Sequence, residues 1–386
     1  MKYTYPTYQR YQIEPSTGQG SQLTATNGKT YLDFTSGIGV CNLGYKNPAL
    51  LAQVHDQVDK LWHISNLYEN DLQDQVAHLL VGAADKQVFF CNSGTEANEA
   101  AIKLARRVTG KAGILAFTNG FHGRTYGSLS ATDNAAIKTG FGPFVPDISF
   151  APYNEQAALA QITPDLAAVI LEVIQGEGGV VLGDPAWLQA VNQKCQATGV
   201  LLIIDEVQTG MGRTGSLFAY EQFNLDPDIV TLAKALANGI PVGAVIGRKA
   251  FAKDFGPGSH GSTFGGNLIA MAAAKGVLQQ LTPDFLKDIK AKGQEFQQDL
   301  QANLAALPNV VAVSGLGLMA GIQLTDKLSA DQVVQQLQKV GLLTLTAKHN
   351  VLRLLPPLVT TTAALHQGIS LIKQVLQEVP YESISR

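Results

Sequence analysis

Hydrophobic and polar positions follow two different rhythms along the chain. Between residues 46 and 275, amphipathic stretches with an apolar residue every three or four positions alternate with short, continuous apolar runs. The stretches LLAQVHDQVDKLWH and TEANEAAIKLARRV predict helices, and the runs QVFFCN, GILAF, AAVILEV, VLLIID and VGAVIG predict strands. Continuously apolar strands are buried on both faces, so the pattern predicts an α/β fold with a mostly parallel sheet covered by helices.

The spacing of apolar and polar positions changes in residues 276–386. A long amphipathic stretch, PDFLKDIKAKGQEFQQDLQANLAAL, precedes the strand-like VVAVSGLGLMAGIQL, the helical SADQVVQQLQKV and a last helix from Thr361. Strands and helices in this order favour a separate, smaller α+β domain. We expect the N-terminal segment, residues 1–45, to join that domain.

Composition narrows the classes of partner. The chain has 386 residues, of which 46% are hydrophobic and 15% charged, as in an ordinary globular enzyme. Its 28 basic and 31 acidic residues give a net charge of −3, which offers no electrostatic reason to bind nucleic acid or an anionic membrane. We expect small-molecule substrates and a second copy of the chain as partners.

Cysteines and histidines give no sign of a disulfide framework or a metal site. The 3 cysteines are far apart and lack C-x-x-C spacing, and the 7 histidines form no cluster. The N-terminal MKYTYPTYQRYQIEP is polar and aromatic where a signal peptide would be apolar, and no run reaches membrane-spanning length. These features predict a cytoplasmic protein.

The stretch LLIIDEVQTG carries two adjacent carboxylates, Asp205 and Glu206, at the end of an apolar run. A carboxylate inside a covered sheet needs a cationic partner. Successive strand side chains point to opposite faces, so Glu206 should face away from Asp205 if the strand continues through it. We interpret Glu206 as structural and paired elsewhere.

The stretch CNSGTEANE describes a strand end that turns into a helix, and Ser93 and Glu96 have the spacing of a capping box. One interpretation is an ordinary capped helix. The alternative is a phosphate-binding cup formed by Gly94, Thr95 and the free N–H groups at the start of the helix.

Lys234, in IVTLAKALANGIPVGA, stands among apolar residues. It is either a surface lysine with a buried stem or a lysine in a dry pocket, where a lowered pKa lets its amine form a Schiff base with an aldehyde. Pyridoxal phosphate supplies such an aldehyde, and its pyridine nitrogen works best when a buried carboxylate keeps it protonated. Asp205 is the candidate for that carboxylate.

Phe121, in NGFHGRT, is either a core residue or a ring that stacks on the pyridine. In the second case Val207 would press on the opposite face of the pyridine, and Gln208 could reach its hydroxyl group.

Seven motifs then occur in one order over almost the whole chain: SGTEANE, FHGRT, QGEGG, LLIIDEVQTGMGRTG, LAKAL, HGSTFGGN and LRLLPPL. This ordered set resembles the class-III aminotransferases, which are pyridoxal-phosphate enzymes of fold type I. Within that family the chain is most similar to members that act on N2-acetyl-L-ornithine. The resemblance implies transfer of an amino group to 2-oxoglutarate, giving N-acetylglutamate 5-semialdehyde and L-glutamate in arginine biosynthesis.

The resemblance also implies roles for single residues. Lys234 resembles the cofactor-bonding lysine, Asp205 the partner of the pyridine nitrogen, and Phe121 the stacking ring. Gly94 and Thr95 resemble the phosphate cup. In the family, the equivalent of Thr263 completes the phosphate site from the other subunit, with Ser262 beside the substrate, which implies a homodimer.

Two arginines are expected because the acceptor carries two carboxylates, and a guanidinium pairs bidentately with a carboxylate. Arg353 resembles the arginine that holds the carboxylate next to the reacting carbon, and Arg124 the one that holds the distal carboxylate. Surface ion pairing is the alternative for both. Glu177 resembles a gate that pairs with Arg353 when the donor has no carboxylate there, since an unpaired buried charge is costly.

Ile38 bears on the choice of donor. Ornithine-specific relatives usually carry tyrosine at this position, so Ile38 argues against ornithine without excluding 4-aminobutyrate. A sister ω-aminotransferase that uses 4-aminobutyrate, ornithine or succinylornithine is the alternative. The other hypotheses are an aminomutase or racemase on the same scaffold, and a cofactor-binding module without catalysis.

Overall fold

The computed structural model of the chain describes residues 3–378. Its largest sheet has seven strands, and β12 runs antiparallel to both of its neighbours while the other paired neighbours are parallel. In spatial order the strands are β4 (Lys86–Cys91), β12 (Gly243–Arg248), β11 (Ile229–Leu232), β10 (Leu201–Asp205), β7 (Leu166–Leu171), β5 (Gly113–Phe117) and β6 (Ile148–Ala151). The predicted α/β class with a mostly parallel sheet is confirmed.

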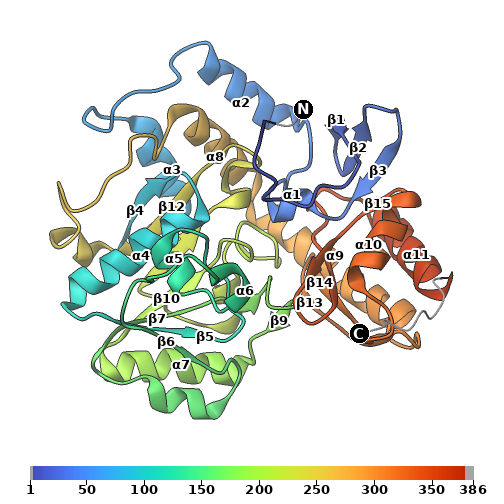
Figure 1. Cartoon of the computed structure of the whole chain (residues 1–386). Coiled ribbons are helices and arrows are strands. Elements are labelled where there is room, and N and C mark those ends of the chain that lie inside the picture. The colour runs from blue at the N-terminus through green and yellow to red at the C-terminus, as the bar shows by residue number, and fades with distance from the viewer. Residues whose placement is uncertain (1–2, 379–386) are drawn as a thin grey trace.

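Helices cover both faces of this sheet (Figure 1). On one face α4 (Gly94–Thr109) packs its alanine-rich side against a cluster that includes Ile203 of β10. On the other face α7 (Pro185–Thr198) packs against a cluster that includes Leu202 and Ile204. The alternation along β10 therefore assigns odd positions to the α4 face and even positions to the α7 face.

The remaining helices of this part surround the sheet. Helix α8 packs against both α2 and α3. The bounds are α2 (Pro48–Val58), α3 (Asp71–Val81), α5 (Tyr126–Ser130), α6 (Ala135–Lys138) and α8 (Leu268–Gln280), with 3₁₀ turns at Gln156–Gln161, Ala219–Phe223, Lys234–Ala237 and Lys249–Lys253. Helix α2 ends earlier than its apolar periodicity predicts, since residues 59–63 form a turn and loop.

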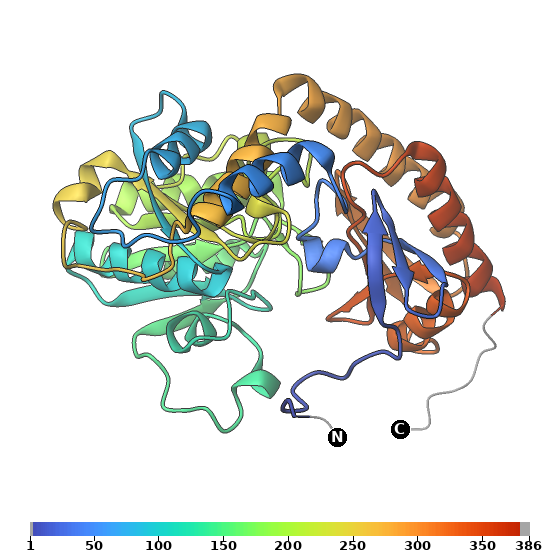
Figure 2. The same ribbon diagram turned by 90° about the horizontal axis from the view of Figure 1, so that it is seen from above.

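The C-terminal part has an antiparallel sheet in the order β13, β14, β17, β16, and a short N-terminal sheet lies beside it (Figure 2). The N-terminal strand β3 pairs in parallel with β15, so segments from the two ends of the chain share one sheet. The elements are β13 (Val310–Leu316), β14 (Met319–Leu324), β15 (Leu342–Leu343), β16 (Leu345–Ala347), β17 (Val351–Leu354), α9 (Pro283–Leu304), α10 (Ala330–Lys339), α11 (Thr362–Glu378), β1 (Pro15–Gln19), β2 (Gln22–Ala25) and β3 (Thr30–Asp33).

Two short elements connect these parts. The two-stranded ribbon of β8 (Ile174–Gln175) and β9 (Val181–Leu182) follows β7, and α1 (Ser36–Gly39) is a turn rather than a regular helix because Gly37 and Ile38 have left-handed backbone angles. Helix α8 runs through the predicted boundary between residues 275 and 276, and the division at residues 45 and 275 stays a prediction. Within residues 3–378, no helix combines the length and apolarity needed to cross a membrane.

Candidate active site

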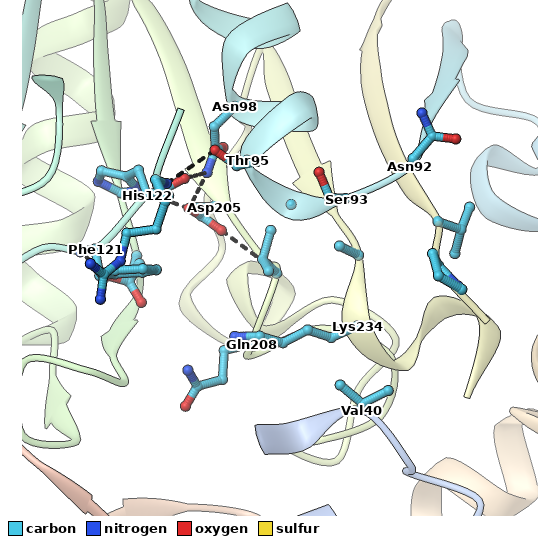
Figure 3. A pocket seen from close by; sticks show the side chains of 18 of the residues that line it. Val40, Asn92, Ser93, Thr95, Asn98, Phe121, His122, Asp205, Gln208 and Lys234 are labelled. Atoms are coloured by element: carbon cyan, nitrogen blue, oxygen red, sulfur yellow. Dashed lines mark hydrogen bonds and ion pairs between the residues drawn. The ribbon is translucent and has the colours of Figure 1, made fainter. Parts of the chain in front are cut away.

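A cavity of about 400 Å³ lies at the carboxyl ends of the central strands. Several of its lining residues follow strands of the sheet closely, which is where open α/β sheets bind their ligands. Figure 3 shows Ser93 and Thr95 after β4, Asp205 at the end of β10 and Lys234 after β11 around the same space. The volume suits a small organic molecule.

Asp205 is held by three hydrogen-bond partners (Figure 3). Its Oδ2 accepts from Asn98 Nδ2 at 2.7 Å and lies 2.8 Å from His122 Nδ1, and its Oδ1 accepts from the Val207 amide at 3.0 Å. Asn98 belongs to α4, so Asp205 points to the α4 face, as its odd position on β10 requires.

His122 supplies the cationic partner that a buried carboxylate needs. Burial lowers the pKa of His122, but the hydrogen bond to Asp205 and the charges of Asp205 and Glu172 outweigh it, so the pKa is raised. His122 can therefore balance the charge of the Asp205 carboxylate inside the protein.

Glu206 lies apart from this network. It is buried, its Oε2 accepts from Thr209 Oγ1 at 2.7 Å, and its Oε1 accepts from the Tyr220 amide at 2.8 Å. These partners are a hydroxyl and an amide rather than the expected cation. Burial accordingly raises the pKa of Glu206 to about 7.

Lys234 begins the 3₁₀ turn after β11, and its side chain reaches into the cavity (Figure 3). Its φ of 45° lies in the left-handed region, which a non-glycine residue adopts at a cost that is common in active sites. Burial lowers the pKa of Lys234, against the opposing effect of Glu177. A larger share of unprotonated amine is what a nucleophile or a base requires.

The start of α4 forms an anion site within the cavity. Ser93 caps the helix by accepting from the Glu96 amide at 3.3 Å, while the Glu96 carboxylate accepts from the Asn92 amide at 2.8 Å. The amides of Gly94 and Thr95, the first two helical residues, have no acceptor within the helix and line the cavity. A Cβ on Gly94 would lie 2.8 Å from the Val207 side chain, so only glycine fits there.

Phe121, Val207 and Gln208 complete the wall. The Phe121 amide donates to Glu172 Oε1 at 3.0 Å, which fixes the loop that carries the ring. Gln208 Oε1 accepts from Arg353 Nη1 at 3.2 Å, so Gln208 links the cavity to that arginine.

Arg353, on β17, is paired with Glu177. Its Nη1 donates to Glu177 Oε1 at 2.6 Å, and its Nε has no hydrogen-bond partner among the described residues. The arginine side chain is only 3% exposed, whereas that of Glu177 is 34% exposed. Glu177 is therefore the solvent-facing member of the pair and Arg353 the buried one.

Four predicted site residues lie at or beyond the edge of the cavity. Arg124 lines it, and its guanidinium carbon lies 5.9 Å from the centre of the Phe121 ring. Ile38 is 46% exposed on the α1 turn, whereas its neighbour Val40 lines the cavity. Ser262 and Thr263 line a separate cavity of about 770 Å³ and not the cavity of Lys234, although Ser262 Oγ accepts from Asn92 Nδ2 at 3.0 Å.

Sequence reasoning missed Glu172, His122 and Asn98. Glu172 follows the apolar run of β7 as Asp205 ends that of β10, so the same signal could have found it. Burial and the neighbouring Asp205 charge raise its pKa. Asn98 and His122 carry no such signal, because only the packing of α4 and the loop after β5 brings them to Asp205.

The cavity thus holds a buried amine, a buried carboxylate with a histidine partner, a helix start that attracts anions, and an aromatic ring. This set fits an aromatic aldehyde that bears a phosphate and a basic ring nitrogen, as pyridoxal phosphate does. Gly94, where a Cβ would collide with the Val207 side chain, also lies at this anion site.

Comparison with known proteins agrees with this chemistry. Residues 3–376 match the family model "Aminotransferase class-III". The chain is 59% identical over 382 residues to the acetylornithine aminotransferase of Lactiplantibacillus plantarum, with 99% of this chain and 98% of the relative covered. It is 52% identical over 380 residues to that of Listeria innocua, with 98% of each covered.

Solved structures give the same result. An ornithine aminotransferase from Toxoplasma gondii, described with partial occupancy of PLP at its active site, superposes with a TM-score of 0.93 at 31% identity, covering 97% of this chain and 92% of that one. An N-acetylornithine aminotransferase from Stenotrophomonas maltophilia has a TM-score of 0.83 at 32% identity, covering 96% and 97%. The expected type I fold is confirmed, and the chain belongs to the class-III aminotransferases.

Proposed function

We propose that this chain transfers the terminal amino group of N2-acetyl-L-ornithine to 2-oxoglutarate, with pyridoxal phosphate as cofactor, as a step of arginine biosynthesis. The pair of Arg353 and Glu177 carries the proposal, because it lets one cavity accept two differently charged substrates. The names of the relatives from Lactiplantibacillus plantarum and Listeria innocua support the same donor.

When bound, pyridoxal phosphate withdraws electrons from the substrate carbon that loses its proton. The amides of Gly94 and Thr95 would hold its phosphate, and the Asp205 carboxylate would hold a proton on its ring nitrogen. Phe121 and Val207 would contact the two faces of the ring, while Gln208 would meet its hydroxyl group.

Lys234 would bond the cofactor between turnovers and act as acid and base during them. Once the donor amine has displaced it, its neutral Nζ would take the proton from the donor carbon that bears the amine and, as general acid, would deliver a proton to the former aldehyde carbon of the cofactor. In the second half-reaction it would move a proton in the reverse direction, from that carbon to the carbonyl carbon of the acceptor. The burial that lowers the pKa of Lys234 favours the neutral form that this task needs.

Arg353 and Glu177 would alternate between the half-reactions. N-acetylornithine has no carboxylate beside its reacting carbon, so Glu177 would remain on Arg353 and keep that buried guanidinium paired. Glutamate brings a carboxylate to this position, which would replace Glu177 as the bidentate partner.

Arg124 would hold the carboxylate at the far end of either substrate, and Ile38 would contact the donor from the α1 turn.

We also propose a cytoplasmic homodimer in which Thr263 and Ser262 of the second copy reach this cavity, since both lie outside it within one chain. Thr263→Ala would then weaken cofactor binding, although Thr263 lies outside the Lys234 cavity of its own chain. Unchanged cofactor affinity in that variant would contradict the shared site.

The donor is tested by comparing kcat/KM for N-acetylornithine, succinylornithine, ornithine and 4-aminobutyrate with 2-oxoglutarate as acceptor. We expect N-acetylornithine to exceed 4-aminobutyrate by at least about tenfold, equivalent to about 1.4 kcal/mol of transition-state discrimination. A tenfold preference for 4-aminobutyrate would overturn the proposed donor and leave the transaminase mechanism in place.

A further inference from the structure

Lys348 begins the tight turn between β16 and β17, and β17 is the strand that carries Arg353. The same turn contains Asn350, whose Nδ2 donates to the carbonyls of Thr325 and Leu328 at 3.0 Å and 2.8 Å. These bonds fix the turn to the loop that follows β14. Lys348 is thus part of a turn that is bonded to the C-terminal part and continuous with the strand of Arg353.

The ammonium of Lys348 contacts the other part of the molecule. Its Nζ donates to Asn119 Oδ1 at 3.1 Å and to the Asp133 carbonyl at 2.6 Å. These two residues are the ends of segment 119–133, and they are bonded to each other, because the Asn119 amide donates to Asp133 Oδ2 at 2.8 Å. The Asp133 amide also donates to the Gly120 carbonyl at 3.0 Å. Lys348 therefore binds this segment at the point where its two ends meet.

The segment bound by Lys348 carries Arg124, and the loop of Glu177 reaches the same junction. The Lys348 amide donates to the Glu177 carbonyl at 3.0 Å. The next turn of that loop is closely packed, since a Cβ on Gly179 would lie 3.1 Å from the Lys348 carbonyl oxygen. One residue thus connects the backbone segments that carry Arg124, Glu177 and Arg353.

Lys348 makes these contacts outside the cavity. Neither it nor its two acceptor residues, Asn119 and Asp133, line the cavity of Lys234. Both acceptors of the ammonium are neutral oxygens, a side-chain amide and a backbone carbonyl, so the bonds fix a position and add no opposite charge. Any effect of Lys348 on substrates must therefore act through the residues that it holds.

We propose that Lys348 is a positioning residue that sets the separation between Arg124 and Arg353, and thereby favours a substrate with a carboxylate at each end. This inference rests on the proposed function, in which the two arginines bind both carboxylates of glutamate at once. N-acetylornithine places a carboxylate on Arg124 only, since Arg353 then stays with Glu177. Binding at two fixed points gains most from groups that are held in place beforehand, so the glutamate half-reaction depends most on Lys348.

The test follows each half-reaction separately, in single turnovers of the full enzyme with its bound cofactor. Lys348→Met keeps an apolar stem and removes the ammonium. The apparent dissociation constant of glutamate should rise by about tenfold in this variant, while its maximal rate stays within about threefold of the parent. For N-acetylornithine both quantities should stay within about threefold, so the preference between the two substrates changes.

Lys29→Met is the matched control. Lys29 Nζ likewise donates to two neutral acceptors on another segment, the carbonyls of Gln338 and Lys339 at 3.0 Å and 2.7 Å, and Lys29 does not line the cavity. We expect this control to leave both half-reactions unchanged.

Asn119→Gly tests the same contact from its other side. It removes one acceptor of Lys348, and glycine adopts the left-handed backbone of this position, with a φ of 63°, without strain. It should weaken glutamate binding less than Lys348→Met does. In the double variant the loss should exceed that of Lys348→Met by no more than about twofold, because the two residues share one interaction.

Three results would overturn the role of Lys348, in variants shown to be folded by circular dichroism. They are equal losses for glutamate and N-acetylornithine in Lys348→Met, no loss for either substrate, and an equal change of preference in Lys29→Met. Failure of the proposed function is seen in the parent enzyme alone, as a cofactor that does not respond to N-acetylornithine, and it would remove this inference as well.

Discussion

Asp205 and Glu206 are adjacent and equally buried, yet they lie on different faces of one sheet. Asp205 faces α4, with Asn98 and His122 as its partners and the cavity beside it. Glu206 has a hydroxyl and an amide as partners and does not line the cavity. A step of one residue along the chain reverses the direction of the side chain and so separates the carboxylate in the cavity from the one outside it.

Asp205 and Glu206 also differ in whether a cationic partner balances the carboxylate. Asp205 has a histidine that can carry a proton against it, so its negative charge is balanced inside the protein. Glu206 has no such partner among the residues described, and burial raises its pKa to about 7. An acidic group at the end of a buried strand is thus a candidate for catalysis only where a cation or a ligand meets it.

The largest expected effect is the contrast between two single variants, in which the carboxylate of Asp205 or of Glu206 is replaced by the amide of the same shape. Asp205→Asn should lower kcat/KM by about a thousandfold or more, or about 4 kcal/mol of transition-state stabilisation, because an amide cannot hold the ring nitrogen protonated. Glu206→Gln should stay within about threefold of the parent, since Glu206 lies outside the cavity. Equal losses in the two variants would contradict the assignment.

A smaller effect is expected from the neighbours of Asp205. Asn98→Ala removes three hydrogen bonds, to the Asp205 carboxylate, to the His122 carbonyl and from Thr231 Oγ1. The bond to the carboxylate alone is worth roughly 1.5–3 kcal/mol, so cofactor binding should weaken by about tenfold to a hundredfold. Asn192→Ala is the matched control on the α7 face, where Asn192 Oδ1 accepts from the Asp226 amide at 3.3 Å. We expect that control to lose stability while its cofactor dissociation constant stays unchanged.

The smallest effect concerns pH. Because the pKa of Glu206 is raised from 4.5 to about 7 in the folded chain, folding favours its protonated form, and its contribution to stability is lost as pH rises from about 4.5 to above 7. Glu206→Gln removes this dependence, so its free energy of unfolding relative to the parent should rise between pH 5 and pH 8 by about 1–3 kcal/mol. Denaturant unfolding at both pH values measures this difference, and a difference that falls with pH would contradict the buried, unbalanced carboxylate.

The sequence predicted the main elements because local pattern determines them. The run LLIID is apolar enough to require burial, and β10 occupies Leu201–Asp205. The capping signal at Ser93 likewise places the start of α4 at Gly94. Both depend on residues that are close in the chain.

The missing parts of the site depend on contacts between distant segments. His122 lies 83 positions from Asp205, and Asn98 lies 107 positions from it. Arg213 is a further example, because it is fully buried with only neutral acceptors, among them the carbonyl of Leu318 at 2.8 Å. Burial lowers the pKa of Arg213 to about 9. The sequence GRTG around it is polar and rich in glycine, so it does not predict a fully buried guanidinium.

The most direct measurement follows the visible absorbance of the purified enzyme with its bound cofactor while substrates are added one at a time. We predict that N-acetylornithine alone bleaches the band of the lysine-bound cofactor and that 2-oxoglutarate then restores it, in the parent and in Glu206→Gln. Asp205→Asn should show neither change at a comparable rate. A parent band that responds to neither substrate, or an Asp205→Asn variant that responds like the parent, would contradict the site built on Lys234 and Asp205.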